Sequence, residues 1–468
     1  MVARAPRWLL VTGLVAAVLV GIAGTAGGAV VSVAFAAPIR GYLTPLPPTP
    51  EVAYPVPGLQ AAPQPVLAAA GGADPTAEGL ASQLGQALAD SRLGPSVSVS
   101  VRDGNTGESL YGHTDSSSVP AASATKLLTA TAALESFGPD YRFKTRAVAG
   151  AAGAVYLVGG GDPTLGIGPK TAYPDAARLD QLAAQVRKAL GGASVSKIIV
   201  DTSLFSGPTQ AAGWDPTDVS GGDVAPITAL MVDGGRTSPS EDARGRTTTP
   251  AVFAAQGFAQ ALGVPSAYIT SGKAPAGARE LGSVSSPMLS GIVYDNLQIS
   301  DNVISEVLAH QVGLKNGQPG SFAGGAAAVI ATLSKLGVPA GDATLSDASG
   351  LSRNDRVSAR LLSSVLATAS SPAHPNLRPA ITGLPVAGYS GTLDSRFQDG
   401  KSRAGAGLVR AKTGTLSGVS SLAGTLVDSS GQVLVFAVVA DKVPNGGTSA
   451  AEDALDAVAA KLAGCGCS

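Results

Sequence analysis

The most constraining feature of the sequence is a Ser-x-x-Lys segment, residues 123–126, followed by an apolar run that ends at Phe137. Residues three positions apart lie on one face of a helix, so the Ser123 hydroxyl and the Lys126 amine should lie close enough to exchange a proton. A serine hydroxyl is a weak nucleophile near neutral pH, and an uncharged lysine can accept its proton. We therefore predict a helix over 127–137 with a nucleophile and its base at its start.

Two other segments have patterns that are weak alone. Ser-Asp-Asn at 300–302 precedes an apolar helical run, and Lys-Thr-Gly at 412–414 precedes two predicted strands. The first pattern is also that of ordinary helix caps, and it recurs at 352–354; the second also suits an edge-strand lysine before a turn. A second Ser-x-x-Lys, at 194–197, runs into a β-branched strand, where its two side chains would point to different faces.

The N-terminus predicts export from the cytoplasm. Arg4 and Arg7 precede an uncharged, largely apolar run from Trp8 to Ala37. Residues 1–37 are interpreted as a signal peptide, with a cleavage site at 34–36, or as a membrane anchor that is retained. Residues 38–75 are rich in Pro and Ala and predict an extended linker.

Composition argues against several functions. The 32 basic and 33 acidic residues give a net charge of −1 without a basic run, which disfavours nucleic acid as a partner. The three histidines, His113, His310 and His374, lack the spacing of metal ligands, so we predict no metal and no cofactor. Cys465 and Cys467 lie in a predicted C-terminal tail, 465–468, and we expect a minor structural role, with a bridge to each other or to another chain as the alternative.

Both ends of the folded chain are predicted to share one antiparallel sheet. Its first strand, 97–101, alternates Val with Ser and predicts a half-buried strand; a second strand follows near 109–111, and two more are expected at 419–427 and 433–440. Ser449 and Glu452 form a capping-box pattern for the last helix.

Residues 144–284, called the inserted segment below, are predicted to form a second domain. Strands are expected at 154–158 and 197–200, and helices at 179–190 and from Pro250. The serine domain would then comprise 76–143 and 285–464.

Taken together and in this order, the three short segments resemble the Ser-x-x-Lys, Ser-Asp-Asn and Lys-Thr-Gly set of β-lactamases and penicillin-binding proteins. The chain is most similar to low-molecular-mass D-alanyl-D-alanine carboxypeptidases with a large insertion between the first two motifs. Further matches lie at 157–165, 225–230 and 347–353, where Ala348 stands in place of the usual glycine. The resemblance covers about Leu80 to Leu462. It implies an α+β fold: an antiparallel sheet flanked by helices, a helical subdomain and an inserted smaller α/β domain.

The resemblance also implies roles for individual residues. Ser123 would attack the carbonyl between two D-alanines while Lys126 accepts its proton. Burial and the positive charge of Lys412 would lower the pKa of Lys126 in the required direction. Ser300 and Asn302 would relay the proton to the departing D-alanine and hold the substrate amide.

The third motif is implied to bind the substrate's carboxylate. Lys412 and Thr413 would hold this terminal group, and Gly414 would let the substrate lie along the strand. The backbone N–H groups of Ser123 and Thr415 would form the oxyanion hole. Arg353 is a candidate for contacting an acidic peptide side chain, or else an ordinary surface arginine.

The expected function is that of an exported, envelope-located serine D-Ala-D-Ala carboxypeptidase that acts on peptidoglycan stem peptides and is inhibited by β-lactams. Endopeptidase cleavage of cross-links would use the same groups. A β-lactamase of class A needs a loop glutamate after the second motif, and the only glutamate between Asn302 and Lys412 is Glu306, one helical turn beyond Asn302. A catalytically silent envelope-binding module on this fold would have lost a motif residue, and a histidine-dependent hydrolase would need a different serine motif.

Overall fold

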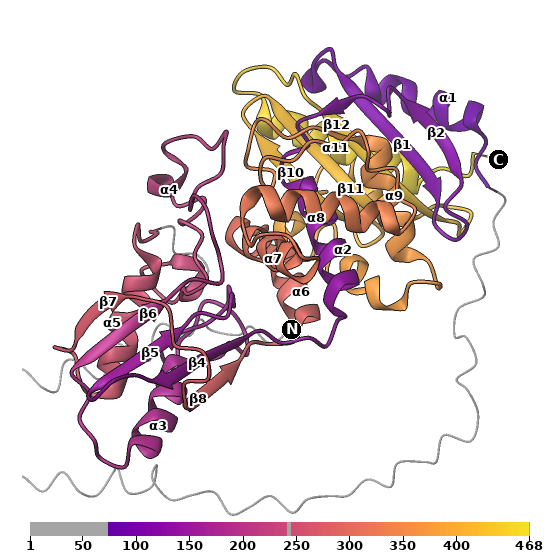
Figure 1. The fold of residues 1–468 in the computed structure, drawn as a ribbon. Coiled ribbons are helices and arrows are strands. Elements are labelled where there is room, and N and C mark those ends of the chain that lie inside the picture. Colours follow the sequence, from indigo (N-terminus) through magenta and orange to yellow (C-terminus); the bar gives the residue numbers. More distant parts are fainter. Residues whose placement is uncertain (1–73, 241–244, 468) are drawn as a thin grey trace, which may run out of the picture. The chain divides into compact units, whose positions relative to one another are not determined.

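The computed structural model describes residues 74–240 and 245–467. Two five-stranded sheets with helices around them form most of this part of the chain, in agreement with the predicted α+β class (Figure 1). The predicted leader, 1–37, and nearly all of the predicted linker, 38–75, lie outside the described residues. Among the helices that are described, none is long and apolar enough to cross a membrane.

The first sheet joins both ends of the folded chain. Its strand order is β10-β11-β12-β1-β2, and every neighbouring pair is antiparallel. The strands are β1 (Val97–Asp103), β2 (Ser109–His113), β10 (Arg410–Leu416), β11 (Val419–Val427) and β12 (Val433–Ala440). The strands predicted at 419–427 and 433–440, and the shared antiparallel sheet, are confirmed.

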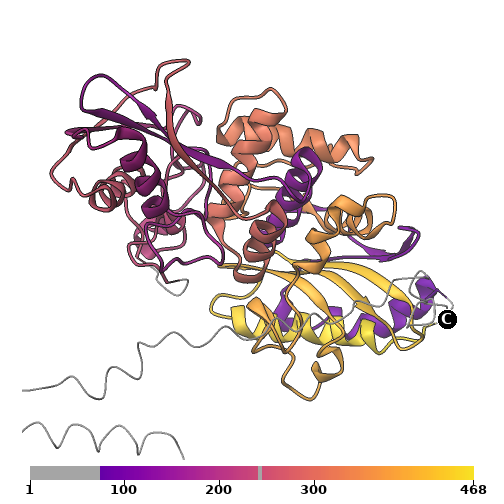
Figure 2. The ribbon, with the colours of Figure 1, turned by 90° about the horizontal axis from the view of Figure 1, so that it is seen from below.

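Helices cover both faces of this sheet (Figure 2). Leu434, Phe436 and Val438 of β12 pack into one core with α1 (Ala77–Leu88) and α11 (Thr448–Ala463). The residues between them pack into another core with α2 (Lys126–Phe137) and α9 (Ala359–Ser370). Each face is therefore closed to water.

The prediction that β1 is half-buried is wrong for this reason. Ser98 and Ser100, which alternate with the valines, are 3% and 0% exposed. They face α9, where Ser100 Oγ lies 2.8 Å from Ser363 Oγ. Small hydroxyl side chains can be buried there because they find hydrogen-bond partners, Ser363 of α9 for Ser100 and Thr114, just after β2, for Ser98.

A helical group surrounds α2 and carries the second motif. It comprises α6 (Leu289–Ile299), α7 (Asn302–Lys315), α8 (Phe322–Lys335) and the short α10 (Pro379–Thr382), and a small two-stranded sheet, β3 (Ser118–Val119) with β9 (Val357–Ser358), lies beside the start of α9. Residues 126–134 of α2 are all buried, so the predicted helix over 127–137 is a central core helix.

The inserted segment holds the second sheet, with strand order β7-β6-β5-β4-β8. β5 and β6, and β6 and β7, pair in parallel, whereas β4 is antiparallel to β5 and β8. Its elements are β4 (Lys144–Ala149), β5 (Ala154–Val158), α3 (Leu179–Leu190), β6 (Lys197–Asp201), α4 (Asp218–Gly221), α5 (Pro250–Leu262), β7 (Tyr268–Ser271) and β8 (Glu280–Ser285). The predicted strands and helices are confirmed, and α3 and α5 pack together with one face of the sheet.

Two details at the C-terminus differ from expectation. The last helix begins at Thr448 after Gly447 without a side-chain cap, and Glu452 instead accepts a hydrogen bond from Thr415 Oγ1 at 2.8 Å, so the predicted capping box is wrong. Cys465 and Cys467 form a disulfide, the alternative to the minor role that we expected for them. Cys465 is 1% exposed, and the backbone N–H of Thr76 donates to Cys467 O, so this tail packs against the N-terminal end of the described chain.

Candidate active site

The amine of Lys126 contacts three different parts of the chain. Its Nζ lies 2.9 Å from Ser123 Oγ, 2.6 Å from Asn302 Oδ1 and 2.7 Å from the backbone oxygen of Ser349. The Lys126 side chain is completely buried. The first and second predicted motifs therefore meet at this amine, together with a carbonyl that the sequence did not indicate as a partner.

The turn before Lys126 fixes the direction of Ser123. Residues 122–125 form one turn of 3₁₀ helix that leads directly into α2. Ala122 has a φ of 50°, a backbone conformation that is uncommon for a residue with a side chain and is often found at functional sites. Gly350 lies so close to Ala122 O that a side chain there would collide with it, and its φ of 78° also requires glycine.

A tight turn at 347–352 presents the Ser349 carbonyl to Lys126. The Asp347 carboxylate accepts hydrogen bonds from the backbone N–H groups of Ser349, Gly350 and Ser352 at 2.7–3.1 Å. Trp214 of the inserted segment donates its indole N–H to the same carboxylate at 2.8 Å. The inserted segment thus supports the turn that contacts the buried amine.

Burial is the main cause of the altered pKa of Lys126. Removal from water lowers its pKa to about 8, and the nearby carboxylates, Asp347 and Glu306 foremost, oppose this shift. We expected Lys412 to contribute to the shift, but the charged groups that act most strongly on Lys126 are acids. The two amines repel each other: burial first, and then the charge of Lys126, lower the pKa of Lys412 well below its usual value.

Glu306 lies on α7, as predicted, with its side chain buried beneath the turn. Its two carboxyl oxygens accept from the backbone N–H of Ala348 at 3.1 and 3.0 Å. Burial and the charge of Asp347 raise the pKa of Glu306 well above its usual value, and the same two causes raise that of Asp355 to about 10. These acids support the turn from behind and do not line the cavity that contains Ser123.

The second motif is fixed by the inserted segment. Asp301 caps α7 by accepting from the backbone N–H of Val303 and Ile304, and it also accepts from Tyr173 Oη at 2.8 Å and Arg236 Nη2 at 2.9 Å. The Arg236 and Asp301 side chains are 4% and 1% exposed. The interpretation of Asp301 as a cap is therefore correct, but the residue also forms buried ion pairs with Arg236 and, at 3.9 Å, with Arg246.

Asn302 and Ser300 lie on either side of Asp301 in different surroundings. Asn302 Nδ2 donates to Asp223 O at 2.9 Å, which orients its Oδ1 toward Lys126. Ser300 ends α6 with a φ of 57° and lines a neighbouring cavity of about 820 Å³, to which Asn302 and Thr392 also contribute. Asn302 thus lines this cavity and also the separate one that contains Ser123.

The third motif lies on β10 beside the serine turn. Lys412 is completely buried and donates to the backbone oxygen of Thr413, whose hydroxyl lies 2.8 Å from Thr392 Oγ1. A Cβ on Gly414 would lie 2.6 Å from Ala121 O, so glycine is needed for the close approach of β10 to this turn. The resemblance implied another reason for this glycine, contact with substrate.

An open cavity of about 590 Å³ lies over Ser123. Asn302, Arg353 and Thr415 line it, together with residues 213–218 of the inserted segment. Arg353 Nη1 donates to Ser417 O at 3.0 Å, which holds the guanidinium at this rim. Within the described residues no cluster of His, Cys, Asp or Glu has the arrangement of a metal site.

The three motifs predict this arrangement: a serine hydrogen-bonded to a buried lysine, with an asparagine and a Lys-Thr-Gly strand beside them. The model of the D-Ala-D-Ala carboxypeptidase 3 (S13) family matches residues 80–248 and 240–462. The chain belongs to this family. The predicted family and the predicted serine hydrolase class are confirmed, and the family's enzymes act in the cell envelope, whereas attachment to the membrane stays a prediction.

Three similar proteins each match more than four fifths of this chain. A carboxypeptidase of Mycobacterium tuberculosis is 42% identical over 403 residues, which cover 84% of this chain and 86% of the relative. Carboxypeptidase DacB of Mycolicibacterium smegmatis is 41% identical over 403 residues, covering 84% and 85%. The crystal structure of penicillin-binding protein 4 of Haemophilus influenzae matches with a TM-score of 0.66 at 21% identity and covers 82% of this chain and 97% of that one. This structural match confirms the predicted fold class.

Sequence reasoning missed the residues that hold the S13 motifs in place. Tyr173, Arg236 and Trp214 had no pattern that pointed to the site. The stretch 347–353 was noted only as part of the family resemblance, and its contact with Lys126 was not foreseen. The separations in sequence, 65 residues between Arg236 and Asp301 and 223 between Lys126 and Ser349, explain why no local pattern could indicate these pairs.

Proposed function

We propose that Ser123 is the nucleophile and Lys126 the general base of a D-Ala-D-Ala carboxypeptidase. One observation carries this proposal: a buried lysine amine that faces the serine hydroxyl and two oxygens that can only accept. An amine without its extra proton has two N–H groups and one lone pair. Asn302 Oδ1 and Ser349 O accept from the two N–H groups, which leaves the lone pair for the Ser123 hydroxyl.

The proposed reaction has two steps. Ser123 Oγ attacks the carbonyl carbon between the two D-alanines while its proton passes to Lys126. The C–N bond then breaks while Asn302 holds the substrate amide, and the terminal D-alanine leaves with the proton that Lys126 took from Ser123, relayed through the Ser300 hydroxyl. Water hydrolyses the resulting ester in the second step and restores Ser123. The backbone N–H groups of Ser123 and Thr415 would stabilise the oxyanion in both steps.

Lys412, Thr413 and Gly414 are proposed to bind the terminal carboxylate of the substrate. Burial keeps the pKa of Lys412 low in the free enzyme, and an arriving carboxylate would favour its charged form. The Thr413 hydroxyl donates to Thr392 Oγ1 at 2.8 Å and would turn its proton to the arriving carboxylate. The enzyme would thus recognise a free C-terminus, the group that distinguishes a carboxypeptidase substrate.

Arg353 is proposed to contact an acidic group farther along the stem peptide. It lines the cavity over Ser123, and its guanidinium is within electrostatic range of Asp215 and Asp218 at the same rim. A rim with both signs of charge suits a peptide side chain that carries a carboxylate and an amine.

We propose that β-lactams acylate Ser123 because their strained amide imitates the substrate, and that cross-linked peptides are cleaved by the same groups. Residues 1–37 would direct export, either as a cleaved signal peptide or as an anchor, and 38–75 would link them to the enzyme. We propose domain boundaries near 143/144 and 284/285; β8 extends one residue past the second boundary.

The test is D-alanine release from a soluble peptide that ends in D-Ala-D-Ala. A matched peptide that ends in D-Ala-L-Ala should remain intact under the same conditions. Release from neither peptide, or equal release from both, would contradict the proposed activity. A β-lactamase would be indicated if rapid benzylpenicillin hydrolysis accompanied the absence of D-alanine release.

A further inference from the structure

A second cavity, of about 590 Å³, lies away from Ser123 on the inserted segment. It forms over the face of the second sheet opposite α3 and α5. Alternate residues of β4 to β6, such as Ala147, Leu157 and Ile198, pack into the core with these helices. Lys144, Arg146, Val158 and Asp201, from the same strands, line the cavity.

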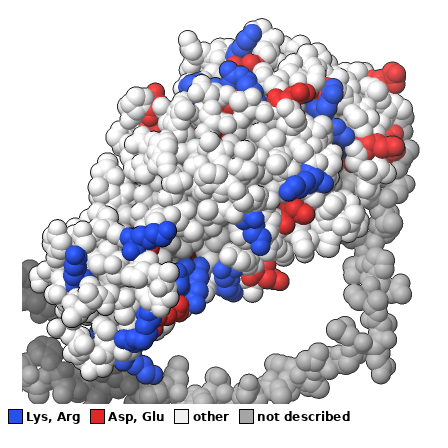
Figure 3. Space-filling view, viewed as in Figure 1, with Lys and Arg blue, Asp and Glu red and all other residues white. Residues whose placement is uncertain are grey.

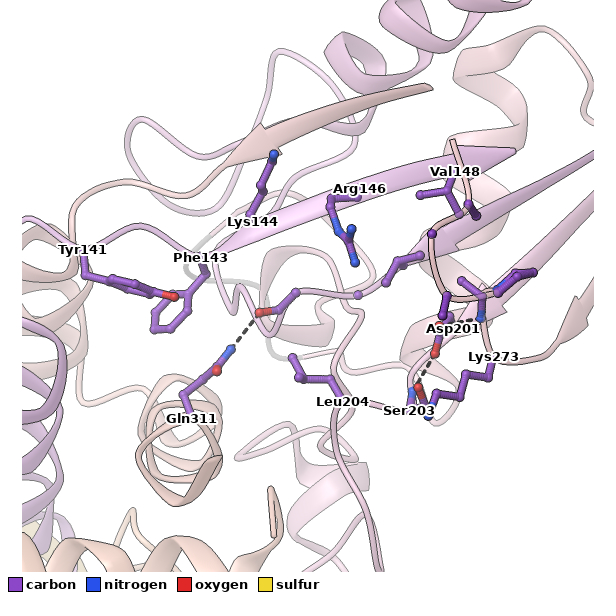
Figure 4. Close-up of a pocket in the computed structure, with 18 residues that line it drawn as sticks. Tyr141, Phe143, Lys144, Arg146, Val148, Asp201, Ser203, Leu204, Lys273 and Gln311 are labelled. Atoms are coloured by element: carbon purple, nitrogen blue, oxygen red, sulfur yellow. Dashed lines mark hydrogen bonds between the residues drawn. The ribbon is translucent and has the colours of Figure 1, made fainter. Parts of the chain in front are cut away.

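The cavity presents two cations, Arg146 and Lys273, whose charges act on Glu280 and Asp201 only at longer range. Neither Arg146 nor Lys273 forms a hydrogen bond or salt bridge with any residue that the structure describes. Both side chains are exposed, and Figure 4 shows them coming from different segments to the same hollow. Lys144, in contrast, pairs with Glu280 at 3.3 Å.

A fixed carboxylate lies beside these cations. Asp201 is 5% exposed and accepts from the backbone N–H of Ser203 at 2.9 Å and of Ala274 at 2.8 Å, which also anchors the loop that carries Lys273. The cavity therefore offers separate places for negative and positive groups. A purely anionic polymer would be repelled by Asp201 and Glu280, and an uncharged glycan would leave Arg146 and Lys273 unused.

The other end of the cavity is less polar and joins the serine domain. Tyr141 packs edge-on against Phe143 and is 42% exposed, so its ring can cover an apolar part of a ligand. Gln311 of α7 donates to Gly160 O at 2.7 Å and closes this end of the cavity (Figure 4). Lys and Arg side chains also gather over the inserted segment in Figure 3.

We propose that this cavity is an exosite for a second stem peptide of polymeric peptidoglycan, with peptide carboxylates at Arg146 and Lys273 and a free amine near Asp201. An uncross-linked stem peptide carries groups of both signs, and the polymer presents many such peptides on one strand. The proposal rests on the proposed function of the Ser123 site. Engagement of two sites by one polymer raises the effective concentration of substrate without changing the chemical step.

The test compares one enzyme on two substrates. The double variant Arg146→Gln/Lys273→Gln should lose about tenfold in kcat/KM for D-alanine release from insoluble peptidoglycan, because two exposed charge contacts are removed. Its turnover of a soluble D-Ala-D-Ala peptide should equal that of the wild type. The control Lys170→Gln/Lys188→Gln removes the same charge from two exposed positions of the inserted segment outside the cavity and should change neither rate.

Several outcomes would overturn the exosite. They are an equal loss on both substrates, no loss on the polymer, or the same loss in the control variant. A competition assay provides a further test. Isolated stem peptides should lower the rate of D-alanine release from peptidoglycan more for the wild type than for the double variant. Competition by a phosphodiester polymer alone would assign the cavity to another class of ligand and reject the proposal. If the wild type fails on the soluble peptide, the proposed function itself fails.

Discussion

The same four-residue pattern, Ser-x-x-Lys, has two different structures in this chain. At 123–126 it forms the turn that enters α2, and the lysine is buried against the serine. At 194–197 the serine is exposed and Lys197 begins β6, where its amine lies 5.8 Å from the centre of the Tyr268 ring. The pattern alone therefore does not determine the chemistry.

Contacts from elsewhere in the chain explain the difference. Lys126 is surrounded by Asn302 of α7 and Ser349 of a tight turn, and these in turn are held by Asp223 and Trp214 of the inserted segment. Comparable support is absent around Lys197 among the described residues. Burial that lowers the pKa of a lysine is thus supplied by tertiary structure and not by the motif.

The largest expected effect comes from the two serines. Ser123→Ala should reduce D-alanine release at least about ten-thousandfold, because the covalent route is lost. Ser194→Ala should leave the rate unchanged. Steady-state kinetics on a soluble D-Ala-D-Ala peptide measure both. Equal rates in the two variants would show that the pattern at 123–126 is not the functional one.

The two lysines should differ almost as much. Lys126→Met keeps a buried side chain of similar length but removes the base, and kcat should fall about a thousandfold. The variant leaves Asn302 Oδ1 and Ser349 O without this donor and should lose about 1–3 kcal/mol of unfolding free energy, so kcat is compared well below the unfolding temperature of both enzymes. Lys197→Met is the matched control. Wild-type kcat in Lys126→Met would show that Lys126 is not the general base.

Arg236 tests whether the inserted segment positions the site. Arg236→Met removes the nearer of the two buried arginines beside Asp301 and leaves only Arg246, whose Nη2 lies 3.9 Å from Asp301 Oδ2. The free energy of unfolding should fall by up to about 3 kcal/mol. Well below its unfolding temperature, kcat should still fall about a hundredfold through displacement of Asn302, while KM changes little. Arg178→Met, which breaks an ion pair of about 30% exposed side chains, should cost less than about 1 kcal/mol. If kcat is unchanged in folded Arg236→Met, the ion pair is only structural.

The pH dependence should be the smallest effect. The neutral form of Lys126 is required, and its pKa is lowered to about 8, so kcat/KM should rise about tenfold per pH unit below pH 8 and level off above it. The residual activity of Lys126→Met should lack this rise. A midpoint near the usual lysine value in the wild type would contradict the role of burial.

The sequence was sufficient to predict strands and motifs whose pattern lies within one short segment. The strands at 154–158, 419–427 and 433–440 have the predicted bounds, and the three motifs were found from short segments. The half-buried interpretation of β1 was wrong because α9 covers its serine face, and the capping box at Ser449 was wrong because Glu452 bonds to Thr415. These errors have one origin, since each depends on an element more than 30 residues away in the sequence. Pairs such as Arg236 with Asp301 were out of reach for the same reason.

Intact mass spectrometry after incubation with benzylpenicillin tests the central claim most directly. The wild type and Ser194→Ala should each gain one covalent adduct, and Ser123→Ala should gain none. An adduct on Ser123→Ala, or no adduct on the wild type, would contradict the assignment of Ser123 as the nucleophile.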